Sequence, residues 1–296
     1  LKQAFAVAGG ASLHRIHSFQ RIDGFSCIPL HHEQSVAMAA DGYARSNETV
    51  GLGIATSGPG AMNLITGMAG SYYDSIPTIF LTGQVSTNRT VGSTGVRQIG
   101  FQETPIIDMV APVTKAAFQI QSPSQVRETL EKSYWIATSG RPGPVLIDVP
   151  DDIQRQQIDW SSQTAFVNPT PEVTVGWESK FSEIQEMIRG AHRPVIVGGA
   201  GIVRAQAGAE FLSFVEYSQI PTVLTWGAGD LLTRDHPLMF GFFGTHGDRG
   251  ANFVIQISDL VISIGSRLDT KATGSPATTF ARSARKVMVD IDDSEI

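Results

Sequence analysis

Apolar positions in the first half of the chain gather in short continuous runs, separated by longer segments with helical spacing. The runs predict strands over residues 5–8, 26–30, 50–56, 77–83 and 144–149. Helices are predicted over residues 13–19, from Glu33 onward, and over residues 61–73 and 124–138. Continuous apolar runs are typical of a parallel sheet with helices on both faces, whereas half-exposed strands alternate apolar and polar residues. We therefore predict an α/β domain with a helix-covered parallel sheet over residues 1–155.

The second half repeats the pattern over fewer residues. Regularity lapses between residues 155 and 177, where Asn168-Pro169-Thr170-Pro171 is typical of a linker. Helices are then predicted over residues 180–190 and 206–218, and strands over residues 194–198, 221–224, 260–265 and 286–291. We therefore predict a linker at 156–176 and a second parallel-sheet, Rossmann-like domain at 177–296.

The composition narrows the class of protein. The 296 residues are 42% hydrophobic and 17% charged, which suits a folded protein with buried cores. A net charge of −6 and the lack of a Lys/Arg cluster argue against nucleic acid as a partner. No apolar run reaches the length of about 18 residues that a membrane span needs. We expect a soluble, cytoplasmic protein with no nucleic-acid or membrane partner.

Cysteine and histidine spacing does not indicate a metal site. Cys27 is the single cysteine, so neither a disulfide framework nor a Cys-based zinc site is possible. His31 and His32 are adjacent and face different ways, and His236 and His246 are isolated in the sequence. No metal held by this chain is therefore expected. The chain also lacks a nucleophile elbow, so the difficult step of any reaction would belong to a cofactor.

Two features of the first half are candidates for chemistry. Glu33 follows a predicted strand and begins a helix of small residues, whose positive end favours an ionised carboxylate. The alternative is an ordinary acidic residue in a first helical turn. Ser57-Gly58-Pro59-Gly60 joins a strand end to a helix start, where backbone N–H groups are free to bind a ligand. The alternative here is a tight strand–helix turn.

The second half contains an incomplete nucleotide-binding signature. Gly198-Gly199-Ala200-Gly201 follows a predicted strand, but the third glycine position of the usual motif falls on Arg204. Arg267 is a candidate for a bidentate contact with a diphosphate, and Asp290 and Asp292 for contacts with ribose hydroxyls. Helix capping and surface ion pairs are the alternative for these side chains.

Many short motifs in the first half resemble, in order and rough spacing, those of the thiamine-diphosphate-dependent enzymes. Within that family the likeness is strongest to the acetolactate synthase large subunits, and residues 190–296 are more loosely similar to the family's middle domain. The matching stretches are Gly9–Ser12, His32–Gln34, Asp41–Arg45, Ala55–Gly60, Asp74–Pro77, Thr82–Val85, Phe101–Pro105 and Thr138–Val145.

The resemblance implies an architecture of three α/β domains. This chain is similar to the pyrimidine-binding and middle domains, and the third domain, whose signature holds Mg²⁺ and the diphosphate, is not found in it. We therefore expect a fragment that carries half a site. In the family the active site lies between subunits, which implies a homodimer or homotetramer.

The resemblance also implies roles for individual residues. The glutamate that matches Glu33 hydrogen-bonds N1′ of the aminopyrimidine and so promotes removal of the C2 proton. Gln84 matches a residue of the catalytic centre. Residues on the substrate side would be Gly10, Ala11, Phe101, Gln102 and Lys115. Further thiamine diphosphate contacts would be Ser57, Gly58, Pro59, Gly60 and Asn63, and flavin contacts Gly199, Gly201, Thr225, Gly265, Arg267, Asp269 and Asp290.

The implied activity is decarboxylation of a 2-oxo acid such as pyruvate with carboligation to a second carbonyl, as in branched-chain amino acid biosynthesis. FAD in a non-redox role is a possible second cofactor. Three features depart from the family pattern: Lys271 stands where the family usually has arginine, the stretch just before Trp177 lacks the arginine expected near the flavin, and the loop over residues 85–97 is longer than in the biosynthetic enzymes. The alternatives are a non-catalytic FAD- or nucleotide-binding module, a flavin-dependent pyruvate oxidase and a coenzyme-A-dependent decarboxylase.

Overall fold

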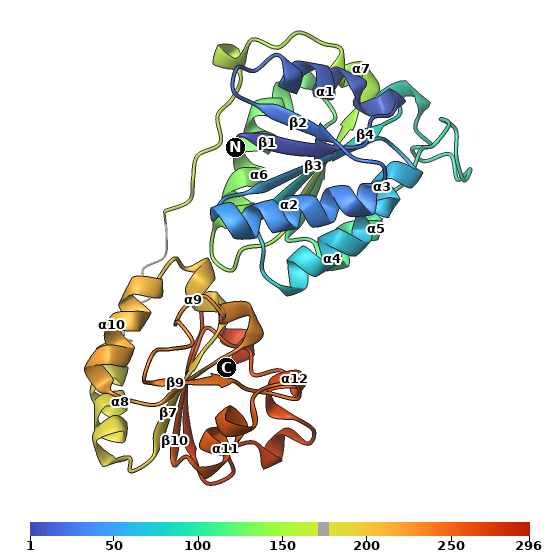
Figure 1. Cartoon of the computed structure of the whole chain (residues 1–296). Helices are drawn as coiled ribbons and strands as arrows, with labels where there is room; N and C mark the ends of the chain where they lie inside the picture. Colours follow the sequence, from blue (N-terminus) through green and yellow to red (C-terminus); the bar gives the residue numbers. More distant parts are fainter. Residues whose placement is uncertain (171–177) are drawn as a thin grey trace. The chain divides into compact units, whose positions relative to one another are not determined.

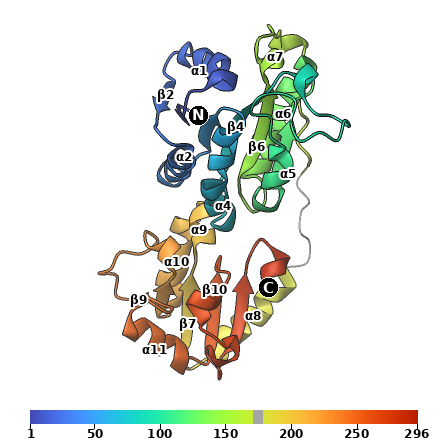
Figure 2. The same ribbon diagram turned by 90° about the vertical axis from the view of Figure 1, so that its right-hand side faces the viewer.

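The computed structural model describes residues 1–170 and 178–296. The chain divides into two units, Leu1–Thr170 and Pro171–Ile296, each built on its own sheet (Figures 1 and 2). The division falls within the segment predicted as a linker. Residues 171–177 lie outside the described part of the chain, and they include the end of that linker, the start of the predicted second domain and the stretch before Trp177.

The first domain contains a six-stranded, wholly parallel sheet in the order β2-β1-β3-β4-β6-β5. Its strands are β1 (Gln3–Ala6), β2 (Ser26–Pro29), β3 (Gly51–Ala55), β4 (Thr78–Gln84), β5 (Ala116–Gln119) and β6 (Val145–Pro150). Its helices are α1 (Leu13–Gln20), α2 (Glu33–Asn47), α3 (Pro59–Asn63), α4 (Ile65–Tyr73), α5 (Ile106–Val110), α6 (Val126–Thr138) and α7 (Asp151–Gln154). The predicted helix-covered parallel sheet is confirmed.

Two hydrophobic layers hold this sheet. Helices α1 and α6 pack on one face, and α2, α4 and α5 on the other (Figure 1). Helix α2 packs closely, because a side chain on Gly51 of β3 would overlap the carbonyl of Ala40, and one on Gly67 of α4 would overlap Ala37. Glycines on β3 and α4, together with the small Ala37 on α2, therefore let this helix lie against a strand and a helix at once.

The structure differs from the predicted elements in several places of the first domain, and the four-residue helix α7 is among the elements that were not predicted. The helix predicted over residues 61–73 begins at Pro59 and divides at Leu64, whose N–H bonds the Ala61 carbonyl three residues back. Strand β5 was not predicted, because its half-buried sequence Ala-Ala-Phe-Gln has no β-branched residue. Helix α5 was not predicted either, since it is only five residues long.

The second domain contains a five-stranded parallel sheet in the order β11-β10-β7-β8-β9. Its strands are β7 (Pro194–Gly198), β8 (Thr222–Leu224), β9 (Met239–Phe242), β10 (Leu260–Ile264) and β11 (Arg285–Val289). Its described helices are α8 (Glu178–Gly190), α9 (Ala200–Arg204), α10 (Gly208–Ser218), α11 (Arg249–Ile257) and α12 (Thr270–Thr273). Helices α8 and α10 cover one face and α11 the other, so the second predicted sheet is also confirmed.

In each sheet the strand order reverses beside the first strand of the sheet in the sequence. In the first domain the chain passes from β1 to β2 on one side and then returns to β3 on the other. In the second domain the corresponding point lies between β7 and β10. Ligands of open α/β sheets bind at the carboxyl ends of the strands beside such a point. Within residues 1–170 and 178–296, no helix has the length and apolar character to cross a membrane.

Candidate functional site

Two turns meet at the reversal point of the first sheet. The short 3₁₀ turn Gly10–Ser12 follows β1, and the turn over residues 56–60 follows β3. A side chain on Gly9 would lie 2.6 Å from Cβ of Thr56, and the Ala11 N–H donates to Thr56 Oγ1 at 3.2 Å. The structure thus brings together the predicted residues Gly10 and Ala11 and the predicted Ser57–Gly60 turn.

Glu33 is the first residue of α2 and lies half-buried at this edge of the sheet. His32 caps the helix, because its Nδ1 accepts a hydrogen bond from the Gln34 N–H at 3.0 Å. Asn63 Nδ2 donates to Glu33 Oε2 at 2.9 Å, and a side chain on Gly60 would lie 3.2 Å from Oε1. No donor in the described part of the chain reaches Oε1, so this oxygen is available to a ligand.

The Ser57–Gly60 turn has the end of a long loop packed on it. Gly58 has φ +59°, and a side chain there would lie 2.8 Å from both Cβ and the carbonyl oxygen of Gln102. Gln102 itself has φ +65°, and the neighbouring Phe101 is 86% exposed. Gly58 is therefore required by its own backbone and by the close approach of the loop. Gln102 therefore joins the same cluster of residues as Ser57, Gly58, Pro59 and Gly60, and Phe101 precedes it in the chain with an exposed ring.

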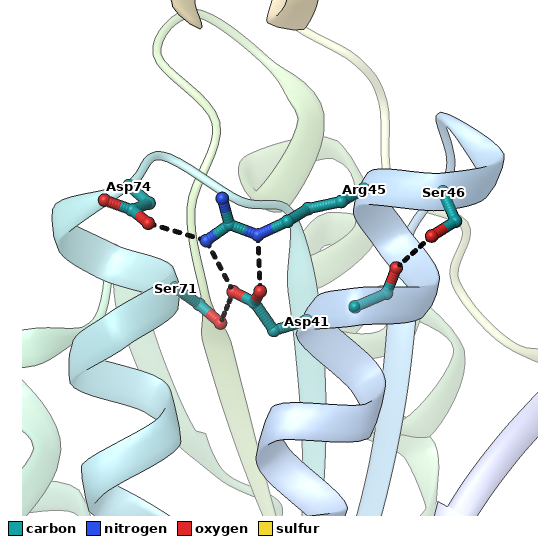
Figure 3. A network of polar contacts seen from close by, with 6 residues as sticks. Asp41, Arg45, Ser46, Ser71 and Asp74 are labelled. Carbon is teal, nitrogen blue, oxygen red and sulfur yellow. Dashed lines mark hydrogen bonds and ion pairs between the residues drawn. The ribbon is translucent and has the colours of Figure 1, made fainter. Parts of the chain in front are cut away.

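A polar network fixes the far half of α2 to α4 (Figure 3). Arg45 Nε donates to Asp41 Oδ1 at 2.6 Å, and its Nη2 to Asp74 Oδ2 at 2.7 Å. Ser71 of α4 donates to the other oxygen of Asp41 at 2.9 Å. Burial alone would lower the pKa of Arg45, but the two carboxylates outweigh it and raise that pKa. The stretch Asp41–Arg45 therefore anchors the helix that begins at Glu33.

Gln84, predicted at the catalytic centre, has a buried side chain with three hydrogen bonds. Its exposure is 3%. Its Nε2 donates to the Thr104 carbonyl at 2.9 Å and to Asp148 Oδ2 at 3.0 Å, and its Oε1 accepts from the Val85 N–H at 3.0 Å. The side chain thus contacts the 85–104 loop and β6, and both of its amide hydrogens are occupied.

The fully buried Asp148 and the half-buried Arg15 form a charged layer below the turns. Burial raises the pKa of Asp148 to about 6, against hydrogen bonds from Thr82, Gln119 and Gln84 and the charge of Arg15. Burial lowers the pKa of Arg15 to about 10, against the charge of Asp148, so Arg15 remains a cation at neutral pH. Its guanidinium donates to the carbonyls of Thr82, Ala11 and Ala55 at 2.6, 3.1 and 3.3 Å.

Sequence reasoning missed both members of this layer. A signal for Asp148 exists, because it interrupts the apolar strand run Val145-Leu146-Ile147-Asp148-Val149 with a carboxylate. A polar residue inside a fully buried strand needs buried partners. Arg15 carries no such signal, since it lies in a helix with little apolar character.

Lys115 lies apart from these residues. It precedes β5, at the edge of the sheet where the parallel strands begin, whereas Glu33 follows the end of β2. Its ammonium donates to the carbonyls of Ile136 and Ser139 at 2.5 and 2.7 Å, at the C-terminus of α6, and burial lowers its pKa. The structure therefore does not bring Lys115 together with the other predicted substrate-side residues.

The reversal point of the second sheet is filled by backbone. A side chain on Gly199 would overlap the Gly265 carbonyl, which accepts a hydrogen bond from the Gly201 N–H at 2.9 Å. Gly265 has φ +61°, and a side chain there would lie 2.8 Å from the Ile202 nitrogen. These three predicted flavin-contact glycines are thus needed for the two turns to pack on each other.

The other predicted flavin contacts lie at the same edge of the second sheet. Thr225 follows β8, and its N–H bonds the Gly198 carbonyl at 2.9 Å. Asp269 caps α12 by accepting from two backbone N–H groups at 2.9 and 3.0 Å, and Asp290 accepts from the N–H two residues on at 3.0 Å. Arg267 follows β10, is partly exposed and lies 3.9 Å from Asp269. Asp269 therefore acts as a helix cap in this structure.

No group of three or more His, Cys, Asp or Glu side chains arranged to hold a metal ion is present in residues 1–170 and 178–296.

Comparison with known proteins identifies both domains. Residues 1–109 match the model of the thiamine pyrophosphate enzyme N-terminal TPP-binding domain, and residues 181–296 match the thiamine pyrophosphate enzyme central domain. The match to the first model covers β1–β4 and the Glu33 site, and the match to the second covers the whole second sheet.

Similar proteins carry the name acetolactate synthase. A probable large subunit from Methanococcus aeolicus is 37% identical over 99% of this chain and 48% of its own length. The large subunit from Corynebacterium glutamicum is 37% identical, over 99% of this chain and 46% of its own length. The isozyme 2 large subunit from Escherichia coli (strain K12) is 36% identical, over 99% of this chain and 51% of its own length. The chain thus spans about half the length of these relatives, and it belongs to the thiamine pyrophosphate enzyme family, of which it contains the N-terminal and central domains.

Proposed function

We propose that the full-length protein containing this chain is an acetolactate-synthase-like enzyme, which decarboxylates a 2-oxo acid such as pyruvate and joins the product to a second carbonyl compound. The observation that carries the proposal is the carboxylate of Glu33. It lies at the reversal point of a parallel sheet, with one oxygen held by Asn63 and the other available. The names of the relatives support the reaction class.

The residues around Glu33 fit the pyrimidine half of thiamine diphosphate. A carboxylate accepts hydrogen bonds only, so the available Oε1 suits a protonated ring nitrogen. Gly60 leaves space beside that oxygen, where a side chain would stand 3.2 Å away. Gly10 has nothing within 4 Å of the position of a Cβ, so this turn is open as well. Thiamine diphosphate, when bound, supplies the nucleophilic carbon and accepts the electrons of decarboxylation.

The chain's own residues would then divide the work. Glu33 holds a proton shared with the ring nitrogen of the pyrimidine, and Asn63 fixes the orientation of its carboxylate. The exposed ring of Phe101 offers an apolar cover for the substrate side, which would exclude water from the reacting atoms.

The same proposal includes a second copy of the chain and a metal. Large apolar side chains are exposed on elements that carry the site, namely Met38 on α2, Met62 on α3 and Phe101 in the 85–104 loop. Such exposure supports a homodimer or homotetramer with the site at the subunit interface. Mg²⁺ and the diphosphate are assigned to residues of the full-length protein outside this chain.

The test is the exchange rate of the cofactor's C2 proton in the full-length protein loaded with thiamine diphosphate and Mg²⁺. Glu33→Gln is expected to slow this exchange by about 10²-fold or more, since it removes the carboxylate that shares a proton with the pyrimidine ring nitrogen. The control is Asp108→Asn, which removes a carboxylate from the first turn of α5. Equal exchange rates in wild type and Glu33→Gln would refute the proposed role.

A second proposal concerns FAD in the central domain. Arg267 supports it, because its partly exposed guanidinium lies at the carboxyl end of β10 beside the reversal point of the second sheet. Arg267→Gln is expected to weaken FAD binding about tenfold, which corresponds to the loss of one charged hydrogen bond. Arg285→Gln, at the opposite end of the neighbouring strand, is the matched control. Pyruvate that bleaches the bound flavin would indicate an oxidase instead, and no flavin binding would remove this proposal.

A further inference from the structure

The segment over residues 85–104 leaves the first sheet after β4 and returns just before α5. One side chain holds both of its ends. Gln84 Oε1 accepts from the N–H of Val85, and Gln84 Nε2 donates to the carbonyl of Thr104, at 3.0 and 2.9 Å. The amide of Gln84 therefore closes the base of this loop.

Asp148 determines which way that amide faces. It lies on the neighbouring strand β6 with no exposed surface, and its Oδ2 accepts the second hydrogen of Gln84 Nε2 at 3.0 Å. Its Oδ1 accepts from Thr82 Oγ1 at 2.7 Å. Because an ionised carboxylate and the Thr104 carbonyl both accept hydrogen bonds, only the NH₂ group of Gln84 suits this position. The opposite orientation would set Oε1 against a buried negative charge.

The loop held in this way is internally ordered and reaches the site. The carboxylate of Glu103 accepts from the N–H groups of Val91, Ile99 and Gly100 at 2.6, 3.1 and 3.3 Å. One residue earlier, Gln102 packs against Gly58 of the turn beside Glu33. Gln102 therefore connects this loop to the turn beside Glu33.

We propose that Asp148 is a positioning residue for the substrate side of the site, because through Gln84 it holds the turn over residues 100–104 against the turn over residues 57–60. This inference rests on the proposed function and gives Gln84 a specific task, which is to hold the loop rather than to contact the substrate. It concerns recognition of the 2-oxo acid. Activation of the cofactor by Glu33 would proceed independently of it.

The experiment measures amide hydrogen exchange in the full-length protein without substrate. Asp148→Ala is expected to speed exchange of the Val91, Ile99 and Gly100 amides about tenfold or more, the fold-change that corresponds to loss of a hydrogen bond to a charged group. The same variant should raise KM for the 2-oxo acid while the C2-proton exchange rate stays at the wild-type value. Asp148→Asn keeps one acceptor oxygen for Gln84 and is expected to restore slow amide exchange.

Two further variants separate this role from general stability. Gln119→Ala removes a 3.1 Å hydrogen bond to the same oxygen of Asp148 but leaves Gln84 in place, so loop exchange should stay slow. Gln84→Leu should release the loop as Asp148→Ala does, and adding Asp148→Ala to it should have no further effect. If Asp148→Ala does not fold, Gln84→Leu decides the question.

Slow loop exchange and an unchanged KM in a folded Asp148→Ala or Gln84→Leu protein would overturn the inference. The inference would also be overturned if Gln119→Ala speeds loop amide exchange as much as Asp148→Ala does. The effect would then come from general destabilisation of the hydrogen-bond network. Amide exchange does not depend on the reaction, so failure of the Glu33 proposal would leave this result interpretable.

Discussion

The two reversal points of the chain differ in whether they contain an open glycine: Gly9 and Gly58 of the first pack as closely as the glycines of the second, but the first also contains Gly10, which does not. In the first sheet, Gly10 has open space around it and Gly60 lies beside the carboxylate of Glu33. In the second sheet, Gly199 and Gly265 press on each other's turns and leave no space for a side chain. A glycine-rich turn after a strand therefore indicates either room for a ligand or close packing of backbone, and the motif alone does not tell which. The atoms that lie next to each glycine determine whether the turn has room for a ligand.

The largest effect is expected where backbone meets backbone. Gly199→Ala should destabilise the second domain by about 3 kcal/mol, because the new methyl group would overlap the Gly265 carbonyl and force the turns apart. Amide hydrogen exchange of β7 and β10 in the full-length protein measures this loss of stability. Gly190→Ala is the control, since Gly190 ends α8 with nothing within 4 Å. Equal stabilities of the two variants would contradict the conclusion that Gly199 is required by close backbone packing.

The charged layer under the first reversal point should make stability depend on pH. Because the pKa of Asp148 is about 6 in the folded protein and 3.8 ordinarily, the folded state binds its proton more tightly than the unfolded state. Stability contributed by this group is thus present below pH 4 and lost as pH rises through 6, by about 3 kcal/mol.

The measurement is the free energy of unfolding of wild type minus that of Asp148→Asn, from denaturant titrations between pH 4 and pH 8. Other titrating groups cancel in this difference, and Arg15 keeps its charge throughout. The difference should fall as pH rises. A flat difference would show that burial does not hold the proton on Asp148.

A smaller effect is expected at the open reversal point itself. Asn63→Ala removes the donor to Glu33 Oε2 and should slow C2-proton exchange about tenfold, the effect of one hydrogen bond to a charged group. Asn47→Ala, which removes a 3.0 Å bond to the Tyr43 carbonyl at the other end of α2, should leave the rate unchanged. The same slowing in both variants would assign the effect to helix stability.

The smallest effect on stability is expected at Gly10. Gly10→Ala should change the free energy of unfolding by less than about 0.5 kcal/mol, because its Cβ would meet nothing within 4 Å. The methyl group would still enter the space proposed for substrate or cofactor. Weaker thiamine diphosphate or substrate binding without loss of stability would sharpen the contrast with Gly199, and a large loss of stability would remove it.

The sequence predicted the two sheets well and the polar layer poorly, for a physical reason. Apolar runs such as 77–83 report burial directly, so β4 and its neighbours could be recognised. Strand β9 could not be recognised from the sequence, because it contains Gly241 with φ +110° and is only half-buried, so it lacks a continuous apolar run. Turn motifs and the resemblance led to the residues near Glu33. The partners of Gln84 come from strand pairing between distant segments, and nothing local in the sequence specifies that pairing.

The fit of α2 against Gly51 and Gly67 restricts how this protein can change over time. A residue larger than alanine at position 37 would have to displace α4, and one at the fully buried position 40 would have to displace its packing neighbours, so the start of α2 would shift. Substitutions along this helix are therefore confined to the outward side, which includes the exposed Met38. Contacts with other molecules can be revised on that side across generations while the carboxylate of Glu33 keeps its place.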